Sequence, residues 1–158
     1  VLPITIRDLI KTALRMRPNR VIVGECRGAE ALDVLQAMNT GHDGSLSTGH
    51  ANSCKDMLSR LETMVLMGME LPLPAIRSQI ASGIDFLIHL GRMRDKSRKV
   101  LSITEIAGYE ENQIILNDIY RFKEEKAEEN TVHGAMEKVG ELIHTEKMIR
   151  AGYCLDGL

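Results

Sequence analysis

The sequence predicts an α/β fold in which a parallel sheet is followed by an antiparallel strand meander and a short C-terminal helix. Two strand-like runs, 20–24 and 45–48, are each followed by a helical pattern, the alternation that builds parallel strands. Three later runs, 86–93, 100–106 and 113–122, are separated only by polar turns, so we expect them to pair antiparallel. One chain of 158 residues is therefore expected to hold both kinds of sheet.

Helices are predicted where apolar residues recur every three or four positions. The first has Thr5 as a candidate N-cap with Asp8 three residues later, which is the spacing of a capping box. Ser53 and Asp56 repeat that signal at the start of the strongest helix, and Pro74 suits the first turn of another. The expected helices cover residues 4–16, 29–38, 51–67, 74–81 and 145–151.

The strand at 20–24 carries the first candidate functional residue. Its continuous run of β-branched residues between chain breakers is typical of a buried central strand, and Glu25 follows it directly. Active sites of α/β folds lie at the carboxyl edge of the sheet, where one carboxylate can orient the water that attacks a nucleotide. From the strand pattern alone, a simple ion pair between Glu25 and Arg27 remains the preferred interpretation.

The segment 40–53 is the second candidate. It combines three glycines, two histidines (His42 and His50) and many hydroxyl groups. Glycines allow the backbone to approach a ligand closely, and imidazoles can donate hydrogen bonds to phosphate. Composition alone leaves a phosphate-binding loop and an ordinary surface turn equally favoured.

Arginines surround both candidates, and each could face a phosphate because guanidinium binds oxyanions with two donors. For each of them taken singly, a structural salt bridge is the preferred role. The arginines concerned are Arg15, Arg17, Arg27 and Arg60.

Composition restricts the remaining function classes. The net charge of −2 gives no reason to expect binding to nucleic acid or to anionic lipid. Three cysteines without close spacing favour a reducing, cytoplasmic compartment, and no apolar run is long enough to span a bilayer.

A metal-binding domain is a further class of function that the sequence could support. Its four candidate ligands match no zinc spacing, so no metal site is predicted. Those candidates are Cys26, His42, His50 and Cys54.

Taken together, residues 14–28 and 40–53 resemble the Walker B and histidine-box regions of ATPases of the type II/IV secretion superfamily. The resemblance is strongest to the CpaF/TadA-like ATPases of Flp/Tad pilus assembly, and the stretch 37–45 is its most specific part. It covers nearly the whole chain and is weakest over residues 123–140. Further matching segments are 57–67, 103–106 and 144–147.

This resemblance implies a RecA-like P-loop NTPase core, of which the chain holds a part over residues 1–122, with a charged linker and C-terminal tail over 123–158. The complete protein is expected to form a homohexamer that binds ATP and Mg²⁺ and drives pilin or protein export. It would lie in the cytoplasm, peripheral at the inner face of the membrane, with platform proteins of the inner membrane as partners. No nucleic-acid partner is expected.

Residue roles follow from the same resemblance. Glu25 matches the catalytic glutamate after the Walker B strand, and His50 matches the histidine-box residue near the terminal phosphate. His42 is its expected companion, and Arg27 matches the arginine after the glutamate. Further phosphate-proximal positions are Gly41, Thr48 and Gly49.

One departure from the family pattern changes the expectation. The phosphate loop has the form G-x-x-x-x-G-K-[ST], and no Gly-Lys dipeptide occurs in this chain. We expect the sequence to begin between the upstream acidic box and the Walker B strand, with the native C-terminus present. The isolated chain is then expected neither to bind ATP tightly nor to hydrolyse it, and to self-associate through an unpaired strand edge. The alternative is a short non-catalytic interaction module that joins a secretion motor ring.

Overall fold

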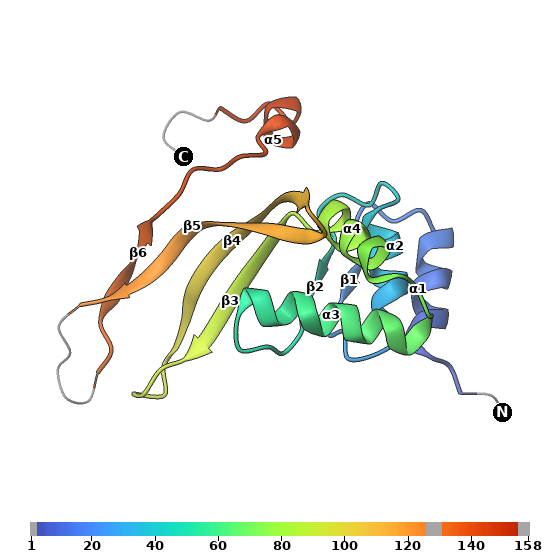
Figure 1. Cartoon of the computed structure of the whole chain (residues 1–158), viewed down its shortest axis with the longest axis horizontal. Coiled ribbons are helices and arrows are strands. Elements are labelled where there is room, and N and C mark those ends of the chain that lie inside the picture. Colours follow the sequence, from blue (N-terminus) through green and yellow to red (C-terminus); the bar gives the residue numbers. More distant parts are fainter. Residues whose placement is uncertain (1–2, 126–130, 155–158) are drawn as a thin grey trace. The chain divides into compact units, whose positions relative to one another are not determined.

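The computed structural model describes residues 3–125 and 131–154 (Figure 1). Its elements alternate at first between helix and short strand and then become a run of strands. In order they are α1 (Ile6–Arg15), β1 (Ile22–Val23), α2 (Ala31–Met38), β2 (Leu46–Ser47), α3 (Cys54–Gly68), α4 (Leu73–Gly83), β3 (Phe86–Arg92), β4 (Arg98–Glu110), β5 (Gln113–Glu124), β6 (Gly134–Lys138) and α5 (Glu146–Arg150).

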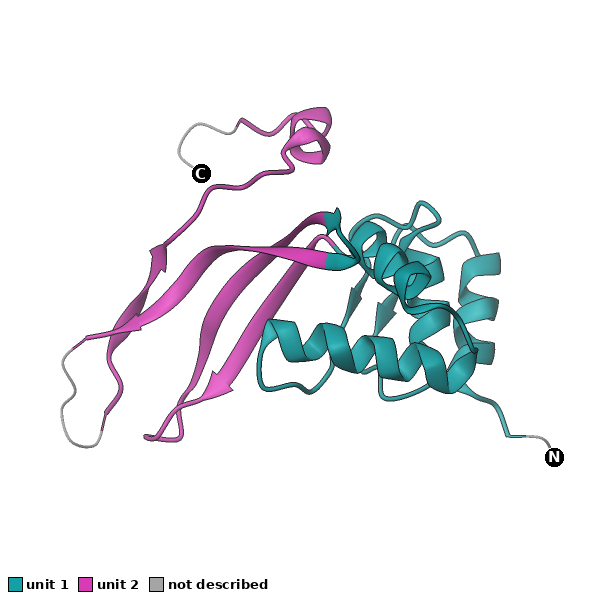
Figure 2. Ribbon diagram, in the orientation of Figure 1, with its two compact units in different colours: residues 1–84, 109–113 teal, residues 85–108, 114–158 magenta. Residues whose placement is uncertain are grey.

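The chain divides into two compact units, shown in different colours in Figure 2. Unit 1 holds residues 1–84 and 109–113, and unit 2 holds residues 85–108 and 114–158. Unit 2 begins at Asp85, just before the first antiparallel strand, and β5 continues to Glu124, past the predicted boundary at residues 122 and 123. The assignment of 1–122 to an ATPase core and 123–158 to a linker and tail stays a prediction.

Unit 1 is built around α2. This helix packs against α1, α3 and α4, and five of its apolar side chains are almost fully buried. Val65 of α3 and Ile76 and Ile80 of α4 are likewise completely covered. Burying a Val, Leu or Ile side chain contributes about 2 kcal/mol, so this helical layer contributes to the stability of unit 1. The buried side chains of α2 are Ala31, Leu32, Val34, Leu35 and Ala37.

The predicted helix ends are confirmed at α1 and α3. Thr5 accepts a hydrogen bond from the Asp8 backbone, and the Asp8 carboxylate accepts one from the Thr5 backbone, which completes the capping box. Ser53 accepts from the Asp56 backbone at 3.0 Å, so α3 begins at Cys54. These caps satisfy N–H groups that have no partner inside the helix.

The prediction that residues 20–24 form a buried central strand is wrong in one respect. Within the described residues β1 pairs only with β2, in parallel register, and Ile22 is 71% exposed. Val23 on the opposite face is buried. The β-branched run therefore predicted the strand correctly. A central strand has a paired strand on each side, whereas within the described residues β1 is paired only with β2.

Unit 2 is a four-stranded sheet in the order β3-β4-β5-β6, in which β3 pairs antiparallel with β4 and β5 with β6. The α/β class with a parallel pair followed by an antiparallel meander is thus confirmed, as is the short helix α5. β6 was not predicted, because its Gly-Ala-Met-Glu-Lys sequence lacks the β-branched residues typical of strands. Most of the predicted linker, residues 126–130, lies outside the described residues.

Among residues 3–125 and 131–154, none of the helices has the length and apolar character needed to cross a bilayer.

Candidate functional site

The parallel pairing of β1 and β2 determines which residues meet. Parallel strands end at the same edge of a sheet, so Glu25, just beyond β1, lies beside the segment 48–50 that follows β2. Backbone contacts join the two segments. Cys26 donates its N–H to the Thr48 carbonyl at 2.9 Å, and the Thr48 hydroxyl donates to the Gly24 carbonyl at 2.5 Å. Thr48 therefore holds the two segments together.

The Glu25 carboxylate is the centre of this edge. Arg27 Nη2 lies 2.6 Å from Glu25 Oε2, and His50 Nε2 lies 2.9 Å from Glu25 Oε1. The Glu25 side chain is 23% exposed, whereas the side chains of Arg27 and His50 are 73% and 78% exposed. The structure thus brings together two of the residues predicted to act on ATP and the arginine predicted beside them.

One oxygen of this carboxylate lacks a hydrogen bond. Glu25 Oε1 is buried and has no hydrogen-bond partner among the described residues, although His50 Nε2 is 2.9 Å away. The imidazole is close enough for a charge interaction but is not aligned as a donor, and alignment is what a hydrogen bond requires. Because an unsatisfied buried oxygen is costly, Oε1 is suited to accept a hydrogen bond from a further donor such as water.

Electrostatics keeps this group ionised. The hydrogen bond from Arg27 lowers the pKa of Glu25, burial opposes it, and the positive charges of Arg27, His50 and Arg60 lower it further. The net shift of the pKa is downward, so Glu25 is a carboxylate at neutral pH, and each of its oxygens is able to accept hydrogen bonds. Arg60 belongs to α3, and its influence on Glu25 was not evident from the sequence, where it is 35 positions away.

Gly49 makes room for α3 to pack against this edge. A Cβ atom at position 49 would lie 2.5 Å from the terminal methyl group of Met57. Its absence lets the thioether cover the segment that carries His50.

Two further residues predicted near the phosphate lie in the turn before β2, and their role stays a prediction. His42 and Gly41 precede β2, whereas His50 follows it, so the strand separates them along its length. His42 Nδ1 is 3.2 Å from the Ala37 carbonyl at the end of α2, and Gly41 has a φ of +85°, which favours glycine. In this structure these residues form the turn between α2 and β2 and share no described contact with Glu25.

A groove of about 300 Å³ runs between α1 and β1 and ends at Glu25. Its lining is almost entirely apolar and contains no lysine or arginine. A triphosphate needs cationic side chains or a nest of backbone N–H groups, so this groove is not a phosphate cradle. The lining residues are Ile6, Leu9, Ile10, Ala13, Val21, Ile22, Val23, Gly24 and Glu25.

The structure gives no geometric support to the hypothesis of a metal-binding domain. Over the described ranges, no three side chains of His, Cys, Asp or Glu are grouped so as to hold a metal ion. Cys26 is buried, and burial raises the pKa of its thiol to about 11, which disfavours the thiolate that a metal would bind. His42 and His50 lie at opposite ends of β2.

Comparison with solved structures defines the class of protein. The chain is similar to the crystal structure of the VirB11 ATPase from the Brucella suis type IV secretion system in complex with sulphate, with a TM-score of 0.62 and 33% sequence identity. The likeness covers 65% of this chain and 32% of that one. The prediction of a partial P-loop ATPase core of the α/β class is therefore confirmed.

The sequence profile of the Type II/IV secretion system protein family matches residues 2–151, and the chain belongs to this family. The superfamily predicted from the sequence is thereby confirmed, while its narrower assignment to Flp/Tad pilus assembly stays a prediction.

Curated relatives agree with this family. The chain is 43% identical over 100 residues to a putative conjugal transfer protein of Mycobacterium tuberculosis, covering 63% of this chain and 28% of that protein. It is 37% identical over 91 residues to the type IV secretion system protein VirB11 of Brucella suis, covering 56% and 25%. An uncharacterised protein of Methanocaldococcus jannaschii is 43% identical over 127 residues, covering 77% and 44%. The chain thus spans between a quarter and a half of the length of these relatives.

Proposed function

We propose that this chain is part of a secretion ATPase in which Glu25 orients the water that attacks the terminal phosphate of ATP. The observation that supports this role most directly is Glu25 Oε1 at the carboxyl edge of β1 and β2, a buried oxygen that accepts no hydrogen bond within the described residues and has His50 Nε2 at 2.9 Å. Positioning of a water requires a carboxylate that is ionised, held in place and able to accept a further hydrogen bond at one oxygen.

The neighbouring residues support this role. Arg27 keeps Glu25 ionised and fixes its orientation through Oε2. His50 lies against the other oxygen and is exposed enough to contact a ligand, so we assign it to the terminal phosphate. Thr48 and Gly49 shape the segment that carries it. The same proposal assigns Gly41 and His42 to the phosphate region, although no described contact supports them.

The site fits one part of an ATP·Mg²⁺ centre. The free oxygen of Glu25 suits a nucleophilic water, but the site offers neither a phosphate-cradling loop nor carboxylates grouped to hold Mg²⁺ over the described residues. Nucleotide affinity must then come from residues outside this chain. When bound, ATP and Mg²⁺ would supply the reacting phosphate and the neutralisation of its charge.

We further propose that the complete protein forms a homohexamer at the inner face of the cytoplasmic membrane. There it would couple ATP hydrolysis to export of pilin or other protein through inner-membrane platform proteins. Support comes from the family match and from relatives named for conjugal transfer and type IV secretion. Flp/Tad pilus assembly is the proposed pathway, on the resemblance of residues 37–45.

A chimera tests the role of Glu25. The segment of Brucella suis VirB11 that aligns with this chain is replaced by the corresponding residues of this chain, and phosphate release is measured. We expect turnover that Glu25→Gln lowers by a factor on the order of 100, since positioned acid–base groups contribute at least that much. Glu70→Gln, an exposed carboxylate outside the site, is the matched control. Equal rates for both variants would contradict the proposal.

The second candidate function is a non-catalytic module that joins a secretion motor ring. It is favoured by a single observation, namely that the sequence has no Gly-Lys dipeptide. The genomic sequence upstream of the codon for residue 1 distinguishes the two functions. An in-frame phosphate loop there supports the ATPase, whereas a start codon with a ribosome-binding site supports the module.

A further inference from the structure

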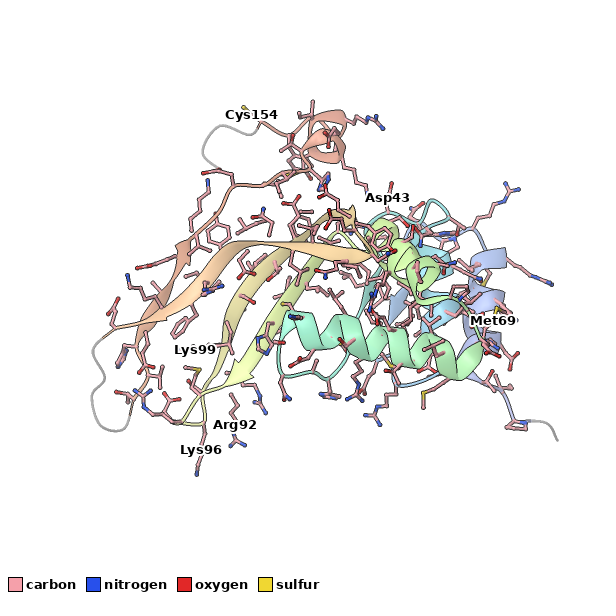
Figure 3. The ribbon with its side chains drawn as sticks, viewed as in Figure 1. Asp43, Met69, Arg92, Lys96, Lys99 and Cys154 are labelled. Atoms are coloured by element: carbon pink, nitrogen blue, oxygen red, sulfur yellow. The ribbon has the colours of Figure 1, made fainter. Side chains whose placement is uncertain are left out.

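The β3–β4 hairpin of unit 2 concentrates positive charge. Residues 92–99 contain five cations and one carboxylate, although the whole chain has a net charge of −2. Figure 3 labels three of the cations at this end of the hairpin, where the side chain of Lys96 extends away from the turn. The five are Arg92, Arg94, Lys96, Arg98 and Lys99.

The internal acids do not neutralise this cluster. Arg94 forms an ion pair with Glu124, and Lys99 lies near Asp95. The Asp95 carboxylate accepts hydrogen bonds from Ser97 and from the Val132 backbone at 2.9 Å, so it points back into the sheet. For the remaining three cations, the described part of the chain provides no ion-pair partner. These are Arg92, Lys96 and Arg98.

Two features of the hairpin are unfavourable for stability. Arg92 and Arg98 are directly opposite each other in the strand register, and like charges in that position repel. Lys96 has a φ of +68°, a conformation that glycine or asparagine adopts with less strain. An external anion that binds both Arg92 and Arg98 would offset their repulsion.

An apolar stripe continues from the cations along the same face of β3. Alternate residues of a strand share a face, and Ile88 and Leu90 are 58% and 64% exposed in line with Arg92. The hairpin therefore presents cations next to large apolar side chains. Phe86 begins this stripe and is 45% exposed, whereas residues 87–108 contain no Phe, Tyr or Trp, so the segment offers one large aromatic ring and not a row of them on which successive nucleic-acid bases could stack.

We propose that the β3–β4 hairpin, residues 86–99, binds the surface of an anionic lipid bilayer. Arg92, Lys96 and Arg98 contact lipid phosphates, and Ile88 and Leu90 enter the headgroup region beside them. Cations next to exposed apolar side chains match the interface of an anionic membrane. Binding of an acidic protein would require only the cations. The inference gives a structural basis for the proposed location at the membrane but does not depend on ATP hydrolysis.

Vesicle flotation of the full chain tests this inference. Vesicles of phosphatidylcholine alone are compared with vesicles that also contain phosphatidylglycerol. We expect flotation only with the anionic vesicles and loss of flotation at high salt. R92Q/K96Q/R98Q is expected to bind on the order of 100-fold more weakly, since each cation contributes roughly a factor of five.

The matched control K11Q/R15Q/K55Q removes the same charge from exposed positions of unit 1 and is expected to float like the wild type. R92K/R98K keeps the charge and should retain binding, which separates charge from folding. No flotation with anionic vesicles would overturn the proposal, as would equal flotation of R92Q/K96Q/R98Q and wild type. Capture by polyglutamate or an oligonucleotide without flotation would assign the hairpin to another acidic partner and also overturn it. Because the readout is independent of ATP turnover, this proposal and the proposed function fail separately.

Discussion

Each unit contains a glutamate with a histidine beside it, and the two pairs differ in what surrounds them. In unit 1, Glu25 lies 2.9 Å from His50 and keeps one oxygen without a hydrogen bond. In unit 2, the Glu105 side chain is 2% exposed, with His144 Nδ1 3.0 Å away. Both positions belong to segments that resemble the same ATPase family, so the sequence alone does not separate them.

The oxygens of Glu105 are fully used. Oε1 accepts from the His144 backbone at 2.7 Å, and Oε2 accepts from the Ile143 backbone at 2.9 Å and from Asn117 at 3.0 Å. Burial raises the pKa of Glu105, but these donors and the His144 ring outweigh it, and the net pKa is lowered. A carboxylate with every lone pair occupied fastens the segment before α5 to the sheet. A carboxylate with a free oxygen can act on a ligand.

The largest expected difference between the pairs is in stability. Glu105→Gln should lower the free energy of unfolding by about 3 kcal/mol, because it weakens bonds to a charged acceptor and buries amide hydrogens against backbone donors. Glu25→Gln should change it by less than about 0.5 kcal/mol. Urea unfolding followed by circular dichroism measures both, since the chain has no tryptophan. An equal loss of unfolding free energy in Glu105→Gln and Glu25→Gln would contradict the distinction between the two sites.

Acid pH provides a second, smaller difference. A lowered folded-state pKa stabilises the fold above the ordinary value of 4.5, and this stability is lost as pH falls through the folded pKa. The wild type should therefore lose unfolding free energy below about pH 4.5, and Glu25→Gln should lose slightly less, because the pKa of Glu25 is also lowered. Glu105→Gln should show a flatter dependence there, because it removes the titrating group. An unchanged slope in Glu105→Gln would show that Glu105 is not linked to folding as described.

The histidines should show the smallest difference. His144→Asn removes one side-chain bond to Glu105 but leaves the backbone bonds, so we expect a loss of about 1 kcal/mol. His50→Asn should leave stability within about 0.5 kcal/mol, because the His50 side chain is 78% exposed. Thermal unfolding of the two variants in parallel measures this difference. A greater loss in His50→Asn than in His144→Asn would contradict the assignment.

Local signals in the sequence predicted much of unit 1. Thr5 and Ser53 cap their helices because each side-chain oxygen accepts a hydrogen bond from the backbone N–H three residues later. This bond depends only on local sequence. Glu25 and His50 could be expected to meet because each follows a strand of the same parallel pair. The β-branched run alone did not indicate that Ile22 is exposed, because burial depends on neighbouring strands and not on the residue itself.

Contacts between distant residues account for what the sequence did not predict. Glu105 binds Ile143 and His144, which are 38 and 39 positions away, and no local pattern indicates which donor a buried carboxylate will find. β6 likewise depends on its pairing with β5 and not on its own composition. His42 was predicted as the companion of His50 from the family resemblance, and this role stays a prediction; in the fold, β2 lies between the two residues along the chain.

The most direct test of the central claim separates ATP binding from hydrolysis in the VirB11 chimera. The dissociation constant for ATP and the single-turnover rate are measured for the parent chimera and for Glu25→Gln. A water-orienting role predicts a dissociation constant within about threefold of the parent and a hydrolysis rate lower by a factor on the order of 100. An unchanged hydrolysis rate, or a loss confined to ATP binding, would contradict this role for Glu25.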